Sequence, residues 1–152
     1  MKKRIYYLAI LFFIIDIIVK QIVVRTMDLY QSIKIIPNFF YLTYTRNTGA
    51  AFSILQNQSI LILLITVIAL FVIYRYINKE TLSNKEMLGY SLIIGGTLGN
   101  LWDRIIYKYV IDFFDFRLFG YHYPVFNTAD SFIVIGIIFL IIISIIKEKK
   151  KG

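Results

Sequence analysis

The chain has 152 residues, of which 59% are hydrophobic and 17% aromatic, and this length allows one compact domain. A soluble domain of this size could not bury so much apolar surface, so the composition predicts a membrane protein. The formal net charge is +8, and the absence of cysteine excludes thiol catalysis, disulfides and thiolate metal sites.

Four apolar segments each approach the roughly 20 residues that a helix needs to cross the hydrocarbon core of a membrane. Backbone groups in lipid must find partners within their own segment, so all four are predicted to be helices of one domain, 1–152. They cover 5–24, 59–77, 87–106 and 127–146. The first follows a basic N-terminus, as in a signal peptide, but its length and internal charges indicate a helix that is retained.

Basic residues flank these segments and predict how the chain is oriented. They form three groups: Lys2, Lys3 and Arg4; Arg75, Lys79 and Lys85; and Lys147, Lys149, Lys150 and Lys151. Under the positive-inside rule, both termini and the 78–86 connection lie in the cytoplasm. The segments 25–58 and 107–126 are then expected on the outer face.

The two outer segments differ in their patterns. Residues 40–45 predict a strand, because Phe40, Leu42 and Tyr44 alternate with Tyr41, Thr43 and Thr45, and aromatic and β-branched types dominate. Pro37 and Asn38 form a turn signal just before this strand. The segment 107–126 is aromatic-rich and is expected to lie in the membrane interface as a short helix or loop. The predicted fold class is an all-α membrane protein of four transmembrane helices, with a small extracytoplasmic β-sheet and an outer-face interfacial segment.

Polar residues gather toward the outer ends of the predicted helices, and charged groups inside a membrane are costly enough to indicate function. Asp16 and Lys20 are four residues apart, so they share one helix face and can pair. The orientation brings five further residues near them, Asn100, Asp103, Arg104, Asn127 and Asp130, with Asp112 and Asp115 in the outer connection. The sequence therefore predicts a polar site at the outer leaflet.

Many of these polar residues also have structural interpretations, which stay open. The Asp16–Lys20 pair can simply neutralise charge, Asn100 can join two helices, and Arg104 can reach lipid headgroups. Asp103 can mark a helix end, and Asp115 can be a solvated loop charge. His122, the only histidine, is expected to be structural or exposed, and Gly95, Gly96 and Gly99 are expected to allow close helix packing.

Asp112 and Asp130 are the strongest candidates for chemistry. Each lies in an apolar context, and two carboxyl groups held together in low dielectric share a proton, which supplies a base for water and an acid for a leaving amine. Two other functions stay open: a Ser–Lys protease built on Lys20 with Ser53 or Ser131, and a small transporter or proton-coupled channel.

Five short motifs resemble the signal peptidase II family, the lipoprotein signal peptidases, in the family's order over essentially the whole chain. They are DIIVK at 16–20, NTGAAFS at 47–53, GNLWDR at 99–104, VIDFF at 110–114 and FNTADS at 126–131. The chain departs from the family at Val19, where Ser or Thr is usual, and at Thr97, where Ala is common.

The resemblance implies a monomeric aspartic endopeptidase of the bacterial cell membrane, with no cofactor or metal ion and no nucleic-acid partner. It implies that the enzyme cleaves diacylglyceryl-modified prolipoproteins just before the lipidated cysteine, and that the cyclic peptide globomycin inhibits it. Asp112 and Asp130 match the family's catalytic pair. The substrate-binding or supporting positions are Asp16, Lys20, Asn47, Gly49, Asn100, Arg104 and Asn127.

Overall fold

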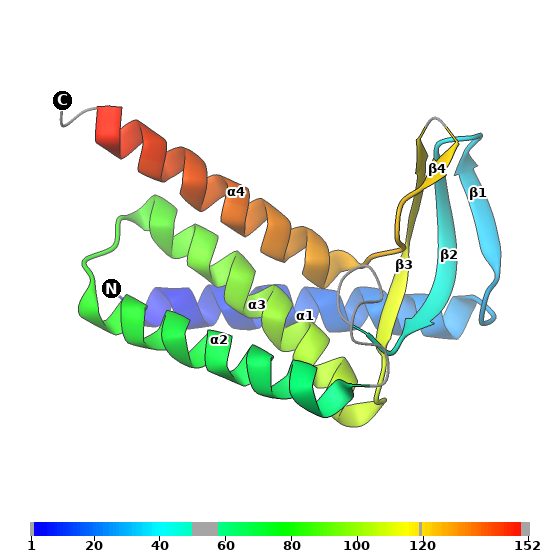
Figure 1. Cartoon of the computed structure of the whole chain (residues 1–152), viewed down its shortest axis with the longest axis horizontal. Coiled ribbons are helices and arrows are strands. Elements are labelled where there is room, and N and C mark those ends of the chain that lie inside the picture. The colour runs from blue at the N-terminus through cyan, green and yellow to red at the C-terminus, as the bar shows by residue number, and fades with distance from the viewer. Residues whose placement is uncertain (1, 50–57, 119, 150–152) are drawn as a thin grey trace.

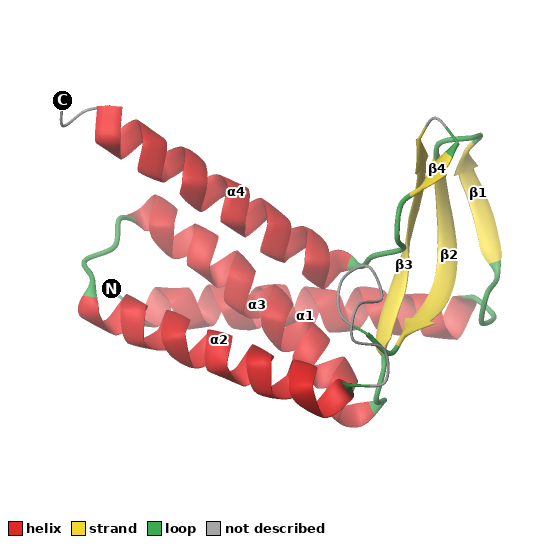
Figure 2. Ribbon diagram, viewed as in Figure 1, coloured by secondary structure: helices red, strands yellow, loops and turns green. Residues whose placement is uncertain are grey.

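The computed structural model describes residues 2–49, 58–118 and 120–149, and consists of a helix bundle with a β-sheet at one end (Figures 1 and 2). All four predicted helices are present: α1 (Lys3–Thr26), α2 (Ser59–Lys79), α3 (Asn84–Ile106) and α4 (Thr128–Lys149). Residues 50–53 of the NTGAAFS motif, including Ser53, lie outside the described residues.

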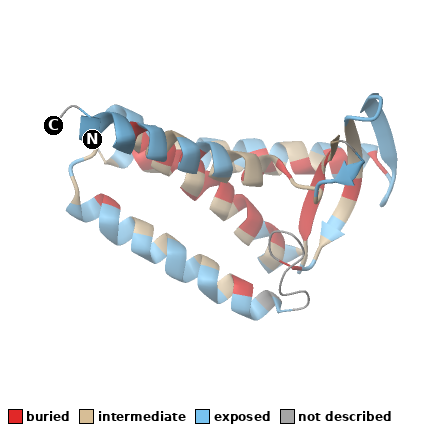
Figure 3. Ribbon diagram, turned by 45° about the horizontal axis from the view of Figure 1, so that its top comes forward, coloured by how far each residue is buried: buried red, intermediate tan, exposed pale blue. Residues whose placement is uncertain are grey.

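The helix α3 is the central element, because it packs against each of the other three helices. Buried residues follow its length, whereas α2 is largely exposed (Figure 3). A Cβ atom added to Gly96 would lie 2.3 Å from the Ala129 carbonyl oxygen, and one added to Gly95 would lie 2.7 Å from that of Ala9. These glycines therefore allow close helix packing, which confirms the prediction made for them.

Three of the described helical stretches are long and apolar enough to cross a membrane: Lys3–Thr26, Ile60–Lys79 and Thr128–Lys149. The 23-residue α3 is of similar length, but glycines and polar side chains occupy its buried face. It begins three residues before the apolar pattern, because Ser83 and Glu86 cap its first turn reciprocally. A polar cap of this kind carries no apolar signal, so a hydropathy pattern places the helix start too late.

The sheet contains four antiparallel strands in the order β1-β2-β3-β4. They are β1 (Ser32–Ile36), β2 (Phe40–Asn47), β3 (Val110–Leu118) and β4 (Tyr121–His122). The strand β2 confirms the predicted one, and the turn before it includes Asn38 in a left-handed conformation with φ 58°. In Figure 1 the sheet stands at one end of the bundle, and the last turns of α1 pass behind it.

The prediction of a short helix or loop at 107–126 was wrong, since most of this segment forms β3 and β4. Val, Ile and Phe in β3 favour extended structure, and β3 pairs with β2 from Asn47 opposite Val110 to Phe40 opposite Phe116. The segment buries residues on both faces, so it lacks the alternation by which a half-buried strand is recognised.

The interpretation of Asp115 as a solvated loop charge was also wrong, because this residue is buried in β3. Thr43 Oγ1 donates to Asp115 Oδ2 at 2.8 Å, and Arg117 Nη2 lies at the same distance. Burial alone would raise the pKa of Asp115, but the hydrogen bonds from Arg117 and Thr43 outweigh it and hold the pKa below its ordinary value.

The sheet is anchored to the end of α1 by a buried apolar cluster. Val23 and Met27 of α1 pack there with Tyr44 of β2 and with Ile111 and Phe113 of β3. Asp112 lies between Ile111 and Phe113, and successive strand residues face opposite ways, so its side chain points away from this cluster. The anchoring therefore directs Asp112 toward the ends of α3 and α4.

Candidate active site

Asp130 is positioned by the first turn of α4. Asn127 Oδ1 accepts a hydrogen bond from the Asp130 backbone N–H at 3.0 Å, and Asp130 Oδ2 accepts one from the Asn127 backbone N–H at 3.3 Å. This reciprocal pattern is a capping box in which an asparagine and an aspartate take the two roles. The start of the helix thus fixes the Asp130 carboxylate.

Asp112 is brought to the same place by β3, and its side chain is only 2% exposed. Asn47 Nδ2 of β2 donates to Asp112 Oδ2 at 3.0 Å, and Asn127 Nδ2 donates to Asp112 Oδ1 at 2.7 Å. Asn127 therefore bonds to Asp112 through its side chain and to Asp130 through its backbone and side-chain oxygen.

The last turns of α3 supply the next contacts. Asn100 Nδ2 donates to Asp130 Oδ1 at 2.7 Å. Arg104 donates to the Asn100 carbonyl oxygen and to the Gly49 carbonyl oxygen, both at 3.1 Å. The Gly49 N–H in turn donates to Asn47 Oδ1 at 2.9 Å. Arg104 is thus tied to the protein backbone, so its predicted freedom to reach lipid headgroups is restricted.

The two carboxyl groups differ from ordinary surface aspartates. The pKa of Asp112 is raised to about 7, chiefly by burial and then by the nearby negative charge of Asp130, which together outweigh the lowering effect of the Asn47 and Asn127 hydrogen bonds. At neutral pH the Asp112 carboxyl group can therefore hold a proton beside a second carboxyl group. Such a pair can accept a proton at one oxygen and donate one from another.

Asp16 and Lys20 form the predicted pair, with Lys20 Nζ 2.8 Å from Asp16 Oδ2. Lys20 is 1% exposed, and its ammonium group also lies 2.9 Å from Asp103 Oδ2 and 3.1 Å from Asn100 Oδ1. Asp103 additionally accepts the Ile111 backbone N–H at 3.2 Å, next to Asp112. Asp103 therefore does more than mark the end of a helix, because it joins the polar residues among which the orientation argument placed it.

A cavity of about 630 Å³ opens beside the two carboxyl groups. Its polar end is lined by Asn47, Asn100, Arg104, Asp112 and Asp130, and its apolar part by Val110, Pro124, Val125, Phe126, Ile133, Val134 and Ile135, with Tyr123 and Ser131. The cavity thus joins candidate catalytic groups to a surface suited to apolar ligands.

Other predicted residues lie away from this arrangement. His122 is exposed on β4, and no group of His, Asp or Glu suited to a metal ion occurs among the described residues. Ser131 Oγ donates to the Asn127 carbonyl oxygen at 2.9 Å, while Lys20 is bound by Asp16, Asp103 and Asn100. The described part of the chain therefore does not pair Lys20 with Ser131.

Comparisons with known proteins agree over nearly the full chain. A family model described as signal peptidase (SPase) II matches residues 8–146. A lipoprotein signal peptidase of Haemophilus ducreyi is 43% identical over 151 residues, covering 96% of this chain and 93% of that protein.

Two solved structures, both described as bacterial membrane enzymes determined by the in meso method at 2.3 and 1.9 Å resolution, share the fold. Their TM-scores are 0.89 and 0.81 at 34% and 36% identity. The first match covers 99% of this chain and 92% of the other, and the second covers 92% and 91%. The chain is therefore a multi-pass membrane protein that belongs to the signal peptidase II family, the proteases that remove signal peptides from prolipoproteins.

Proposed function

We propose that this chain is an aspartic endopeptidase in which Asp112 and Asp130 act together on one water molecule. The observation that carries the proposal is the position of Asn127. Its Nδ2 donates to the Asp112 carboxyl group at 2.7 Å, and its backbone N–H donates to the Asp130 carboxyl group at 3.3 Å. One residue that holds two acids at the edge of a cavity fits a shared catalytic role. The family's function supplies a peptide bond as the reacting group.

The reaction proceeds by general acid–base catalysis. The ionised Asp130 carboxylate takes a proton from the water, whose oxygen bonds to the scissile carbonyl carbon. The protonated Asp112 then gives its proton to the amide nitrogen as the carbon–nitrogen bond breaks. The raised pKa of Asp112, to about 7, supports the acid role for this residue. Asn47, Asn100 and Asn127 hold the carboxyl groups by donating hydrogen bonds.

The proposed substrates are prolipoproteins whose cysteine carries a diacylglyceryl group, cleaved just before that cysteine at the outer leaflet. The apolar part of the cavity, along Ile133, Val134 and Ile135 of α4, supports a ligand with an apolar group next to the scissile bond. Globomycin inhibition and a monomeric state belong to the same proposal. A transporter is less well supported, because the described buried charges of Lys20, Asp103 and Asp112 lie close together and do not form a path across the membrane.

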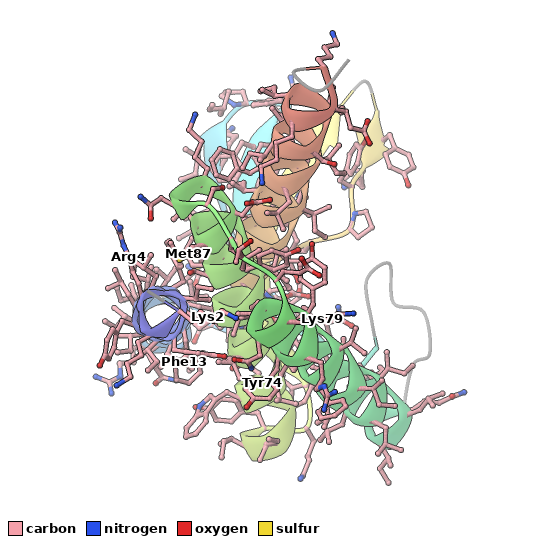
Figure 4. All side chains as sticks on the ribbon, turned by 90° about the vertical axis from the view of Figure 1, so that its left-hand side faces the viewer. Lys2, Arg4, Phe13, Tyr74, Lys79 and Met87 are labelled. Carbon is pink, nitrogen blue, oxygen red and sulfur yellow. The ribbon has the colours of Figure 1, made fainter. Side chains whose placement is uncertain are left out.

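The proposed topology has four crossings of the bacterial cytoplasmic membrane, with both termini inside. Figure 4 views the end of the bundle opposite the sheet, where Lys2, Arg4 and Lys79 lie, and this basic end fits the cytoplasmic side. The test introduces cysteine at Lys79 or Tyr121 and labels intact cells with an impermeant thiol reagent. Because the parent chain has no cysteine, each signal is unambiguous. Labelling at 121 alone is expected; labelling at 79 alone would overturn the topology.

The catalytic proposal is tested with purified Asp112→Asn, Asp130→Asn and the double variant, assayed on a diacylglyceryl-modified substrate. Each single change should lower the rate by about 10²–10⁴-fold, since acid–base catalysis contributes that much. The double variant should be hardly worse, because the two groups act as a unit. Asp115→Asn is the matched control, since Asp115 is buried in the same strand but bonds to Thr43 and Arg117. Near-parental activity in a folded Asp112→Asn or Asp130→Asn protein would exclude the aspartic mechanism.

A further inference from the structure

We infer that Lys20 is a positioning residue, which fixes the side-chain amide of Asn100 so that its NH₂ group holds the Asp130 carboxylate. Lys20 Nζ donates to Asn100 Oδ1 at 3.1 Å, and Asn100 Nδ2 donates to Asp130 Oδ1 at 2.7 Å. An ammonium group can only donate, so the atom that it contacts must be the amide oxygen. The amide nitrogen is then directed to Asp130. The inference rests on the proposed aspartic mechanism.

The ammonium group of Lys20 is itself held in one place. It lies 2.8 Å from Asp16 Oδ2 and 2.9 Å from Asp103 Oδ2, so two ion pairs hold it beside the Asn100 amide oxygen, to which it donates a hydrogen bond. Both carboxylates are at most 1% exposed. Gly99 leaves the room for this cluster, because a Cβ atom there would lie 2.2 Å from Asp16 Oδ2. Side chains of α1 and α3 thus define the position of Lys20.

Lys20 acts through Asn100 and does not touch the substrate. Lys20 does not line the cavity, whereas Asn100 and Asp130 both do. Asn127 Nδ2 also donates to Asn100 Oδ1 at 3.0 Å, but a charged donor forms a hydrogen bond roughly twice as strong as a neutral one. Without Lys20 the amide can turn over, and its oxygen would then oppose the Asp130 carboxylate. The expected loss is therefore in turnover and not in substrate binding.

The test measures kcat and KM for Lys20→Met and for Gln21→Met as the matched control. Gln21 is the next residue of α1 and donates one hydrogen bond, to Tyr107 Oη at 3.0 Å, away from the two carboxyl groups. Lys20→Met should lower kcat about 10- to 100-fold, which is the loss of one hydrogen bond to a charged group. Its KM should stay within about twofold, because uniform substrate binding is retained. Gln21→Met should leave both constants near the parental values.

A second readout is a double-mutant cycle with Asn100→Ala. In that background Lys20 has no amide to orient, so Lys20→Met should change kcat far less than it does in the parent. The inference is overturned by an equal fold-loss in both backgrounds, or by a raised KM with unchanged kcat. If Lys20→Met does not fold, the Asp16→Leu/Lys20→Met pair removes a cation and a carboxylate together, and the same outcomes decide. Failure of the aspartic mechanism is seen separately, as activity in Asp130→Asn.

Discussion

The buried Asp112 carboxyl group should make the stability of the protein depend on pH in a direction opposite to that of most aspartates. Its pKa is raised from 3.8 to about 7 in the folded protein, chiefly by burial and then by Asp130. A raised folded-state pKa gives a stabilising contribution that is complete below the unfolded-state value and is lost as the pH rises through about 7. Replacement by Asn removes this titration.

The magnitude follows from the size of the shift. A change of one pKa unit corresponds to about 1.36 kcal/mol, so the full cost of ionising Asp112 in the folded protein is on the order of 4 kcal/mol. Roughly half of that cost falls between pH 5 and pH 8. For a chain of 150–250 residues, 1 kcal/mol moves Tm by about 2–4 °C. The Tm difference between Asp112→Asn and the parent should therefore become more positive by about 5 °C over this interval.

The assay is thermal unfolding in detergent micelles at pH 5 and pH 8 for the parent and Asp112→Asn. Comparing the two proteins at each pH cancels the other titrating groups and any fixed cost of the substitution. Asp115→Asn is the control, because the pKa of Asp115 is lowered and its ionised form persists throughout this interval. An Asp112→Asn difference that is the same at both pH values would refute the assignment of a raised pKa to Asp112.

Three further outcomes are expected from the same geometry. Cleavage should fall as the pH rises above about 7, because Asp112 then loses the proton it donates, and a kcat/KM profile flat to pH 9 would contradict this. Gly99→Ala should lower Tm by several degrees more than Gly89→Ala does: the new Cβ atom would lie 2.2 Å from buried Asp16, whereas at Gly89 it meets a flexible leucine at 2.7 Å. Arg104→Ala should lower kcat yet leave measurable activity, since among the described residues Arg104 donates to two backbone carbonyls and to neither carboxyl group. Parental kcat and KM would show that it has no role.

The helices could be predicted from the sequence because lipid imposes a simple rule on them. Any long apolar segment must satisfy its own backbone in the membrane, and composition reveals such segments directly. The start of α3 was missed by three residues, since Ser83 and Glu86 form a polar cap in front of the apolar pattern. The strand β3 was missed for a different reason. It depends on pairing with β2, which lies more than 60 residues away in the chain. The local sequence pattern does not predict that pairing.

The residues of the candidate site could be predicted from the sequence, but their mutual contacts could not. Asn47, Asn100 and Asn127 were recognisable as motif residues, yet their donors and acceptors depend on how β2, α3 and α4 meet. The interpretation of Asp115 as a solvated loop charge failed because this residue lies in β3, which forms only by pairing with β2, and a strand puts residues three apart on opposite faces. Secondary structure thus decided which of the two acids faces the cavity.

Asn127 shows why folding and the proposed chemistry are difficult to separate in this chain. Its Oδ1 atom caps the first turn of α4, while its Nδ2 atom donates both to Asp112 and to Asn100. The capping bond fixes the orientation of the amide, so the same interaction that begins the helix also determines which atom meets the Asp112 carboxyl group. Replacing Asn127 by Asp would preserve a cap but place a third carboxylate beside Asp112 and Asp130. In such a variant α4 would still begin normally, although the site would be inactive. Stability and turnover must therefore be measured on the same variants.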